Sequence, residues 1–466
     1  MTPHTSCLNH LLDVFEKNAP QAAIVWRDRS FTYRWMLDRI GHWRGRLESE
    51  RVAAGTVAIL EADFSPDSVS LLLALVERNC ILVPLTRSVA AKKETFIRIA
   101  QGELVITIDD EDRTTLSRLP QAADHGHYRT LRALGHPGLV LFSSGSTGES
   151  KGVVHDITGL LEKFRIPRKR LRTITFLLYD HIGGINTLLY TLSNGGCLVT
   201  VQDRNPDSVL AAVERHRVEL LPTSPTFMNL VLLSEAWKTR DLSSLRTVTY
   251  GTEPMPQSTL ERFHAAMPDV ELLQTYGLSE IGILRSKSRS SDSLWVRLGG
   301  EGFDLRVVDG MLEIKARSAM LGYLNAPSPF TPDGWLRTGD AVETDGEYVR
   351  ILGRRSEMIN VGGEKVFPAE VEGVLQLMDG VAEVVVHGQP NAITGHMVCA
   401  EVRLTSGEPV AEFRTRMRAF CKSRLAPYKI PQKVVLVEEP LHGGRFKKMR
   451  PPTGDVPAAE EEGPRR

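Results

Sequence analysis

A segment rich in glycine and hydroxyl residues, with a single lysine, is the first part of the chain that could do chemistry. It reads SSGSTGESKG over residues 143–152 and follows an apolar run at 139–142 that predicts a buried strand. Backbone N–H groups and one cation after a strand are typical of a polyphosphate site. The segment therefore predicts nucleotide binding, with an ordinary Ser/Gly-rich surface linker as the alternative.

The spacing of this segment does not fit the Walker A loop. That loop has the pattern G-x-x-x-x-G-K-[ST], in which glycine precedes the lysine and a metal-binding hydroxyl follows it. Here Ser150 precedes Lys151 and Gly152 follows it. The segment is therefore a phosphate loop of another kind, and the rest of the chain must show which.

Further motifs follow the loop in an order that suits one nucleotide site. They read YGTEPM at 250–255, QTYGLSE at 274–280, LRTGD at 336–340, GRRSE at 353–357 and GGEKVFPAEVE at 362–372. In this order the motifs resemble those of the adenylate-forming superfamily, which includes acyl-CoA synthetases, peptide-synthetase adenylation domains and luciferases. The resemblance covers residues 139–450.

The resemblance implies roles for particular residues at bound ATP. Tyr276 would form the aromatic wall at adenine, or else be a core tyrosine. Asp340 would accept hydrogen bonds from the ribose hydroxyls, or else cap a turn. Arg354 would contact ribose and phosphate from the domain junction. The full set expected to bind ATP is Ser143, Ser144, Gly145, Ser146, Thr147, Gly148, Lys151, Gly251, Thr252, Glu253, Pro254, Thr275, Tyr276, Gly277, Ser279, Asp340 and Arg354.

The same motifs imply a magnesium site. Glu280 stands where the family has a carboxylate that holds Mg²⁺, and Thr147 is the loop hydroxyl placed nearest the phosphates. A cation that bridges phosphates through one protein carboxylate is ordinary Mg²⁺ behaviour.

Three residues are candidates for catalysis. His181 lies in LYDHIGG, which resembles the family segment H-x-x-G beside the acyl pocket; a buried structural histidine is the alternative. The family also has a lysine in P-x-x-x-x-G-K, and this chain has Arg445 there. Arginine and lysine are not interchangeable at a tight site, so Arg445, Lys447 or Lys448 could serve. A merely solvated basic stretch, or one that touches CoA phosphates, is the other interpretation.

The implied activity has two steps. ATP and a small-molecule carboxylic acid would give an acyl-adenylate and pyrophosphate, and the acyl group would then pass to a thiol, most simply that of CoA. The small lobe would rotate about Ser356 and bring Gly362 and Gly363 over the site. Alternatives are phosphopantetheine on an acyl carrier protein, another nucleophile, or a degenerate protein that binds nucleotide with weak catalysis. The acid pocket is expected near 181–185, 224–227, 250–252 and 277–284, which suits an aryl or aliphatic acid.

The elements that must position these residues indicate an α/β protein. Short apolar runs alternate with helical patterns from residue 22 to 108 and again from 173 to 250, which predicts two stacked α/β layers with parallel sheets. We expect an N-terminal domain at 1–352 with a small β subdomain at 299–352, a hinge at 353–356, a mobile α+β domain at 357–450 and a disordered tail at 451–466. An Asp-Gly pair at 309–310 predicts a β-hairpin.

Bulk properties exclude some partners. Acidic and basic residues both total 57, so no global field would draw the chain onto nucleic acid. No apolar stretch approaches the roughly 20 residues of a membrane span, and no signal pattern opens the chain. The 5 cysteines are scattered, which predicts free thiols and a cytoplasmic location. The oligomeric state is left open.

Overall fold

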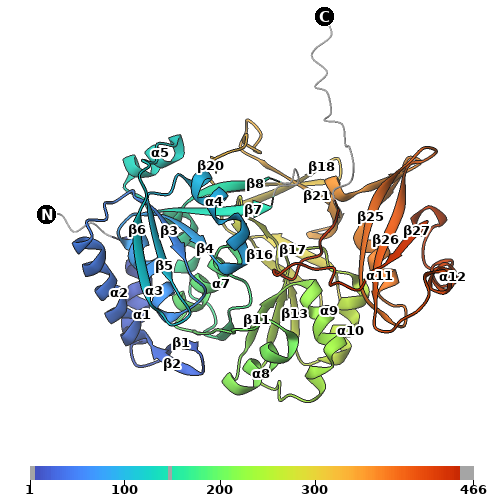
Figure 1. The fold of residues 1–466 in the computed structure, drawn as a ribbon, viewed down its shortest axis with the longest axis horizontal. Coiled ribbons are helices and arrows are strands. Elements are labelled where there is room, and N and C mark those ends of the chain that lie inside the picture. Colours follow the sequence, from blue (N-terminus) through green and yellow to red (C-terminus); the bar gives the residue numbers. More distant parts are fainter. Residues whose placement is uncertain (1–5, 145–148, 452–466) are drawn as a thin grey trace, which may run out of the picture.

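The computed structural model describes residues 6–144 and 149–451, which fold as an α/β protein (Figure 1). Two seven-stranded sheets form most of the N-terminal domain, and a six-stranded sheet follows them. A smaller α+β domain ends the described chain. This architecture confirms the predicted fold class.

The first sheet carries the glycine- and hydroxyl-rich segment. Its order is β20-β8-β7-β4-β3-β5-β6, and β4 pairs in parallel with β3 and β7. The next strand, β8, is antiparallel to β7, so the chain turns back at the end of β7. The strands are β3 (Val57–Glu61), β4 (Ile81–Leu85), β5 (Leu104–Ile108), β6 (Thr114–Arg118), β7 (Gly138–Ser144), β8 (Ser150–Asp156) and β20 (Gly322–Tyr323).

The second sheet includes a strand from the start of the chain. Its order is β13-β12-β11-β9-β10-β1-β2, and β1 pairs in parallel with β10. The prediction that residues 22–108 form one layer was therefore wrong for β1, because its parallel partner β10 lies far along the chain. The next strand, β2, is the antiparallel edge of the same second sheet. The strands are β1 (Ala22–Trp26), β2 (Arg29–Thr32), β9 (Arg172–Ile174), β10 (Cys197–Val199), β11 (Leu220–Thr223), β12 (Thr247–Tyr250) and β13 (Glu271–Gln274).

Polar side chains fix where the main helices begin. Thr32 accepts a hydrogen bond from the backbone of Trp35, and Ser65 and Ser68 form a reciprocal capping box. The helices of the N-terminal domain are α1 (Asn9–Lys17), α2 (Tyr33–Ser49), α3 (Pro66–Glu77), α4 (Lys93–Ala100), α5 (Gly126–Leu134), α6 (Ile157–Leu161), α7 (Ile182–Ser193), α8 (Pro206–His216), α9 (Pro225–Ser234) and α10 (Gln257–Ala266).

One cluster of buried apolar side chains joins the two large sheets. It contains Leu60 and Leu141 from the first sheet, and Ile24 and Leu198 from the second. Helix α3 is buried on all sides within it, which explains why its sequence is apolar around the whole helix. The shared core fixes the two sheets relative to each other, and strand ends from both sheets line the candidate site.

The six-stranded sheet spans Arg285 to Arg354 in the order β16-β17-β22-β21-β19-β18. The predicted hairpin is present between β18 and β19, where Asp309 and Gly310 both have positive φ. The sheet begins before residue 299, at β16. Its strands are β16 (Arg285–Ser288), β17 (Trp295–Gly299), β18 (Phe303–Val308), β19 (Met311–Ala316), β21 (Leu336–Asp345) and β22 (Tyr348–Arg354).

The C-terminal domain follows a short 3₁₀ turn, η4 (Arg355–Glu357). Beyond its last strand, residues 441–450 return to the N-terminal domain, as the dark red segment in Figure 1 shows. We call these residues the C-terminal strap. The domain's elements are β23 (Ile359–Val361), β24 (Glu364–Val366), α11 (Pro368–Leu375), β25 (Val381–Asn391), β26 (Gly395–Leu404), α12 (Val410–Cys421) and β27 (Lys433–Leu436).

Two expectations about the chain as a whole can be compared with these elements. All of the cysteines are free thiols, as predicted. Within residues 6–144 and 149–451, none of the helices combines the length and the apolar character that crossing a bilayer requires. Most of the predicted tail, residues 452–466, lies outside the described residues.

Candidate active site

A cavity of about 1120 Å³ lies where the N-terminal domain, the C-terminal strap and the turn η4 meet. Its walls come from the ends of β7 and β8, the start of α7, the ends of β11 and β12, and the strap. Many of the residues singled out in the sequence line it together: Ser143, Lys151, His181, Gly251, Thr252, Thr275, Gly277, Ser279, Glu280, Arg354, Arg445 and Lys447.

The phosphate segment is a β-hairpin whose arms reach into the cavity wall. Ser143 pairs with Lys151 and Ser144 with Ser150, so much of what the sequence suggested as a loop is strand. Asn325 holds the returning arm: its carbonyl accepts from Gly152 N at 3.0 Å and its amide donates to Ser150 O at 3.0 Å. The predicted ligands Gly145, Ser146, Thr147 and Gly148 lie outside the described residues.

The segment after β12 runs very close to the strand beside it. A Cβ on Gly251 would come within 2.7 Å of the carbonyl oxygen of Thr275, so only glycine fits there. The next residue, Thr252, has φ of 76°, a conformation that costs a β-branched residue roughly 1–3 kcal/mol. Strain of this kind is concentrated at functional sites, and Thr252 lines the cavity.

Glu253 and Pro254 do not line the cavity in the described residues. The Glu253 carboxylate accepts hydrogen bonds from Thr226 N at 2.9 Å and from Lys448 N at 3.2 Å. Glu253 therefore connects the start of α9 to the strap, and a direct contact with nucleotide stays a prediction for both residues.

Tyr276, Asp340 and Arg354 form a connected group. The Tyr276 hydroxyl donates to one oxygen of Asp340, and Arg354 Nε lies 2.9 Å from the other. Burial raises the pKa of Tyr276 well above its usual value, so the phenol stays protonated. The Tyr276 ring packs among apolar residues of the six-stranded sheet and is only 8% exposed. The structure thus places Arg354 in the cavity and Tyr276 and Asp340 behind it; their roles at adenine and ribose stay predictions.

Glu280 presents the cavity with a carboxylate. Tyr323 donates to Glu280 Oε1 at 2.6 Å, and Lys151 Nζ lies 5.2 Å from the Tyr323 ring. Among the residues the structure describes, no group of three or more His, Cys, Asp or Glu side chains could hold a metal by itself. One cavity-facing carboxylate beside a phosphate hairpin does fit Mg²⁺, which usually takes one or two carboxylates and completes its shell with waters and substrate phosphates.

His181 caps the first turn of α7. Its Nδ1 accepts a hydrogen bond from Gly183 N at 3.1 Å, which leaves the ring proton on Nε2. Burial, together with the nearby cations Lys447 and Arg445, holds the pKa of His181 well below its usual value. The ring is therefore neutral near pH 7 and can donate one hydrogen bond in the cavity.

An aromatic side chain anchors the C-terminal strap to the N-terminal domain. The Phe446 ring lies 5.3 Å from the rings of both Phe176 and Phe227. The carbonyl oxygen of Phe446 accepts a hydrogen bond from Ser224 Oγ at 2.7 Å. Residues 224–227 were expected to line the acid pocket; in the described structure they instead help to hold the strap.

The three candidate cations of the strap differ in their ion-pair partners. Arg445 Nη2 lies 2.8 Å from Asp180 Oδ2, and Lys448 Nζ lies 2.7 Å from Glu372 Oε2. Lys447 lines the cavity, and its ammonium makes no hydrogen bond or ion pair with any residue in the described part of the chain. Burial, with a smaller contribution from nearby arginines, lowers the pKa of Lys447 to about 8.

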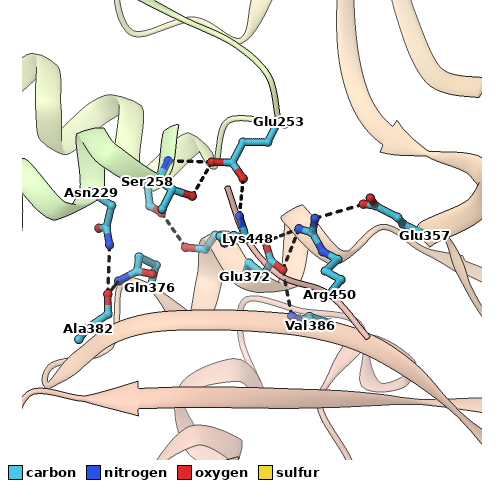
Figure 2. A network of polar contacts seen from close by, with 12 residues as sticks. Asn229, Glu253, Ser258, Glu357, Glu372, Gln376, Ala382, Val386, Lys448 and Arg450 are labelled. Atoms are coloured by element: carbon cyan, nitrogen blue, oxygen red, sulfur yellow. Dashed lines mark hydrogen bonds and ion pairs between the residues drawn. The ribbon is translucent and has the colours of Figure 1, made fainter. Parts of the chain in front are cut away.

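A buried carboxylate ties the strap to its own domain (Figure 2). Glu372, which is 1% exposed, accepts from Lys448 and from Arg450, and also from Val386 N at 2.9 Å. Arg450 reaches Glu357 in the turn η4 at 3.2 Å. The strap, the small domain and the domain junction are therefore held by one network of charges.

Comparison with known families agrees with this geometry. The family model described as "AMP-binding enzyme" matches residues 13–306, and the model described as "AMP-binding enzyme C-terminal domain" matches residues 370–443. This chain belongs to the AMP-binding enzyme family.

Curated relatives of this AMP-binding enzyme include two named ligases. A 3-[(3aS,4S,7aS)-7a-methyl-1,5-dioxo-octahydro-1H-inden-4-yl]propanoyl:CoA ligase of Rhodococcus jostii is 32% identical over 316 residues, which cover 64% of this chain and 61% of the relative. An indoleacetate–CoA ligase of Aromatoleum aromaticum is 29% identical over 330 residues, with 65% and 64% covered. The matches thus span less than two thirds of either relative's length.

Solved structures show the same fold. The anthranilate CoA ligase AuaEII in complex with anthranoyl-AMP superposes with a TM-score of 0.77 at 22% identity, over 92% of this chain and 93% of that one. ATP-bound MatB from Rhodopseudomonas palustris gives a TM-score of 0.74 at 23% identity, over 94% and 96%.

The sequence reasoning missed several residues of this AMP-binding enzyme's site. Asp180, Tyr323 and Asn325 were not among the residues expected to form the site. All three act through partners distant in sequence, namely Arg445, Glu280 and Gly152. No local pattern marks such residues, because only the fold brings the partners together.

Proposed function

We propose that this enzyme activates a carboxylic acid with ATP and transfers the acyl group to the thiol of CoA. A carboxylate oxygen attacks the α-phosphorus of ATP, the bond to the β-phosphate breaks, and pyrophosphate leaves. The thiol then attacks the acyl carbonyl of the adenylate and AMP leaves. The observation that carries the proposal is the convergence of Lys151, Glu280, Arg354 and Lys447 on one cavity. The CoA ligases among its relatives support the same reaction.

Positively charged and hydroxyl groups would hold ATP in this cavity. Ser143, Lys151, Ser279 and Arg354 line the cavity. The first three would face the phosphates, and Arg354 would face the ribose and the α-phosphate. Mg²⁺, held through Glu280 and, as the resemblance implies, Thr147, would neutralise charge on the phosphates. Positioning and charge stabilisation carry most of the catalysis in such transfers, because the protein makes no covalent bond.

Lys447 is the cation we assign to the reacting carboxylate and the α-phosphate. Arg445 aligns with the family's lysine, but its guanidinium is engaged by Asp180. Lys448 is engaged by Glu372. Lys447 lines the cavity without an ion-pair partner in the described residues, and its charged form can therefore stabilise the developing negative charge.

The thiol step would use a different placement of the small domain. Gly362 and Gly363 form the turn between β23 and β24 and are not among the residues that line the cavity. Rotation about residues 353–356 would bring this turn to the site, where its lack of side chains would let a slender pantetheine arm pass. An acyl carrier protein would present the same arm, so it remains the alternative acceptor.

The decisive experiment is a screen for acyl-AMP and pyrophosphate over a panel of carboxylic acids, with and without CoA. Lys447→Ala should slow adenylation at least about tenfold, since a lost charge–charge contact in the transition state is worth more than about 1.4 kcal/mol. Lys422→Ala, an exposed lysine after α12, is the matched control and should not change the rate.

Two other outcomes would contradict the proposal. ATP binding without pyrophosphate release for every acid would point to a degenerate nucleotide-binding protein. Acyl-AMP could also be consumed by a phosphopantetheinylated carrier protein and never by CoA. The acceptor would then be the carrier protein, and the adenylation step would stand.

A further inference from the structure

A half-buried lysine next to the cavity contacts two residues that line it, and the proposed reaction does not use it. Lys163 lies in the 3₁₀ turn η2 (Glu162–Arg165). Its Nζ donates to Asn186 Oδ1 at 2.6 Å and to Ile283 O at 3.0 Å, and it lies 4.8 Å from the Phe164 ring. No carboxylate among the described residues forms an ion pair with Lys163.

This position is costly for a cation. Removing an ammonium from water without an opposite charge costs several kcal/mol unless hydrogen bonds compensate. Burial, with a smaller contribution from Arg285, lowers the pKa of Lys163 to about 7. An ionisable group beside a cavity that has hydrogen bonds but no opposite charge is a candidate for a functional role.

The two acceptors of Lys163 belong to neighbouring elements that line the cavity, α7 and β15 (Gly282–Ile283). Asn186 lies on α7, whose cavity face also carries Ile182 and Gly183, and Ile283 lies on β15. Asn186 and Ile283 both line the cavity. Asn186 follows His181 by five residues, a rise of about 7.5 Å along the helix, so it lies away from the reacting end.

The contact with Lys163 fixes how the Asn186 amide is oriented. An ammonium can only donate, so the oxygen of Asn186 must face Lys163 and its NH₂ must face elsewhere. That NH₂ has no hydrogen-bond partner among the described residues. The side chain is half-buried on the cavity wall and supplies unused donors there.

We propose that the Asn186 amide, which Lys163 holds with its NH₂ away from the ammonium, is a hydrogen-bond donor site for the far end of the acid. The enzyme would prefer carboxylic acids that carry an oxygen acceptor, such as a ketone, remote from the reacting carboxyl group. Leu177, Ile182 and Leu278 also line the cavity, and their apolar side chains suit a ring or a short chain as the spacer between the carboxyl group and the ketone. This inference rests on the proposed function. Its competitor is that Lys163 is only a strut between α7 and β15.

Matched acid pairs test the proposal. In 4-acetylbenzoate and 4-isopropylbenzoate, and in 6-oxoheptanoate and heptanoate, the members differ mainly by one carbonyl oxygen. We expect the wild-type enzyme to release pyrophosphate with kcat/KM several-fold and up to about tenfold higher for the ketone of each pair, mainly through KM, as one neutral hydrogen bond allows. Lys163→Met should abolish this preference, and Lys163→Arg should restore part of it.

Two further variants guard against a folding defect. Asn186→Leu removes the wall donor and should also lower the ketone preference, even if Lys163→Met does not fold. Asn186→Asp replaces the donor with an acceptor, so it should shift preference toward 6-aminohexanoate. Lys238→Met is the matched control: Lys238 lies on the surface, 2.6 Å from Glu235 and 5.7 Å from the Trp237 ring, and its loss should leave the ratio unchanged.

The inference would be overturned if the wild type used both acids of each pair equally, or if Lys163→Met lowered kcat/KM equally for both. Either result would mean that Lys163 only connects α7 to β15. Pyrophosphate from no acid at all would contradict the proposed function instead. In that case calorimetry with 4-acetylbenzoate still decides the inference: binding must be present in the wild type and weakened in Lys163→Met.

Discussion

Asp180 and Arg445 form an ion pair of 2.8 Å between residues that lie 265 positions apart. The Asp180 side chain is 2% exposed and belongs to the N-terminal domain, whereas Arg445 comes from the C-terminal strap. Thr86 also donates to the same Asp180 oxygen at 2.7 Å. The pair joins the two parts of the molecule beside the cavity and places the neighbouring Lys447 inside it.

Removing this pair should impair the first step of the reaction selectively. Arg445→Ala leaves the buried Asp180 carboxylate without its cation, which typically costs 3–5 kcal/mol and favours release of the strap. We expect adenylation to fall at least about tenfold. Thioester formation from supplied acyl-adenylate should change less, because it uses another placement of the small domain. Separate assays of the two half-reactions make the comparison.

The control for that variant is an exposed ion pair of similar length. Arg217 and Asp241 lie 2.7 Å apart with both side chains 55% exposed, so Arg217→Ala should have little effect. Equal losses in both half-reactions of Arg445→Ala would instead mean that Arg445 contacts substrate directly.

Adenylation should depend on the charge of Lys447. With a pKa of about 8 the ammonium loses its proton as pH rises through that value, and the rate should fall because the positive charge is lost. The profile of kcat/KM for ATP should therefore decline above pH 8, since it reports groups of the free enzyme. Lys447→Arg should remove that decline, because arginine stays charged. A decline that persists in this variant would assign it to another group.

The contribution of Lys447 to stability should change with pH in the opposite direction to its contribution to the adenylation rate. Its folded pKa of about 8 lies below the ordinary 10.5, so between these values the unfolded chain binds more protons than the folded one. The contribution of Lys447 to the free energy of unfolding therefore rises with pH across this range. Urea titrations of the wild type and Lys447→Met at pH 7 and pH 10 should show the difference between them shrinking at the higher pH.

Thr252→Gly should stabilise the protein. Glycine adopts positive φ without the penalty that threonine bears, and roughly 1 kcal/mol should remain after the entropic cost of glycine. Thr239→Gly, at an exposed position with φ of −111°, is the control and should be slightly destabilising. Thermal unfolding measures both. A lower melting temperature for Thr252→Gly would mean that interactions of the threonine outweigh the strain.

Glu372→Gln should loosen the strap from its own domain. Lys448 and Arg450 would then lie close together without the buried carboxylate that now neutralises them (Figure 2). We expect a loss of several kcal/mol in unfolding free energy, as for a broken buried ion network. Glu408→Gln, which removes a half-exposed pair with Arg416, should cost much less. Denaturant unfolding of both variants gives the comparison.

Gly363→Val should slow thioester formation more than adenylation, the reverse of the effect expected for Arg445→Ala. Gly363 has φ of 94°, and in this arrangement it does not line the cavity. We expect near-normal pyrophosphate release but slow thioester formation with CoA, because the turn would reach the site only after the small domain rotates. A variant slowed equally in both steps would argue against that rotation.

Much of the fold could be predicted because its signals are local. The α/β class follows from the alternation of short apolar runs with helical patterns, and the hairpin at 309–310 follows from the positive φ that Asp-Gly tolerates. The first strand was placed in the wrong sheet because strand pairing is not local. Its parallel partner, β10, lies more than 150 residues away, and the sequence of β1 does not identify it.

The sequence by itself determined the family, the order of the site motifs and the presence of a basic segment at the far end. These depend on residue types and short spacings, which local backbone conformation and hydrogen bonding constrain directly. The tertiary structure decided which partner each candidate cation has. All three line the cavity, but Arg445 pairs with Asp180 and Lys448 with Glu372, whereas Lys447 has no ion-pair partner among the described residues. The physical reason is that an ion pair depends on distance in space and on burial, and both are set only when the strap packs against the N-terminal domain.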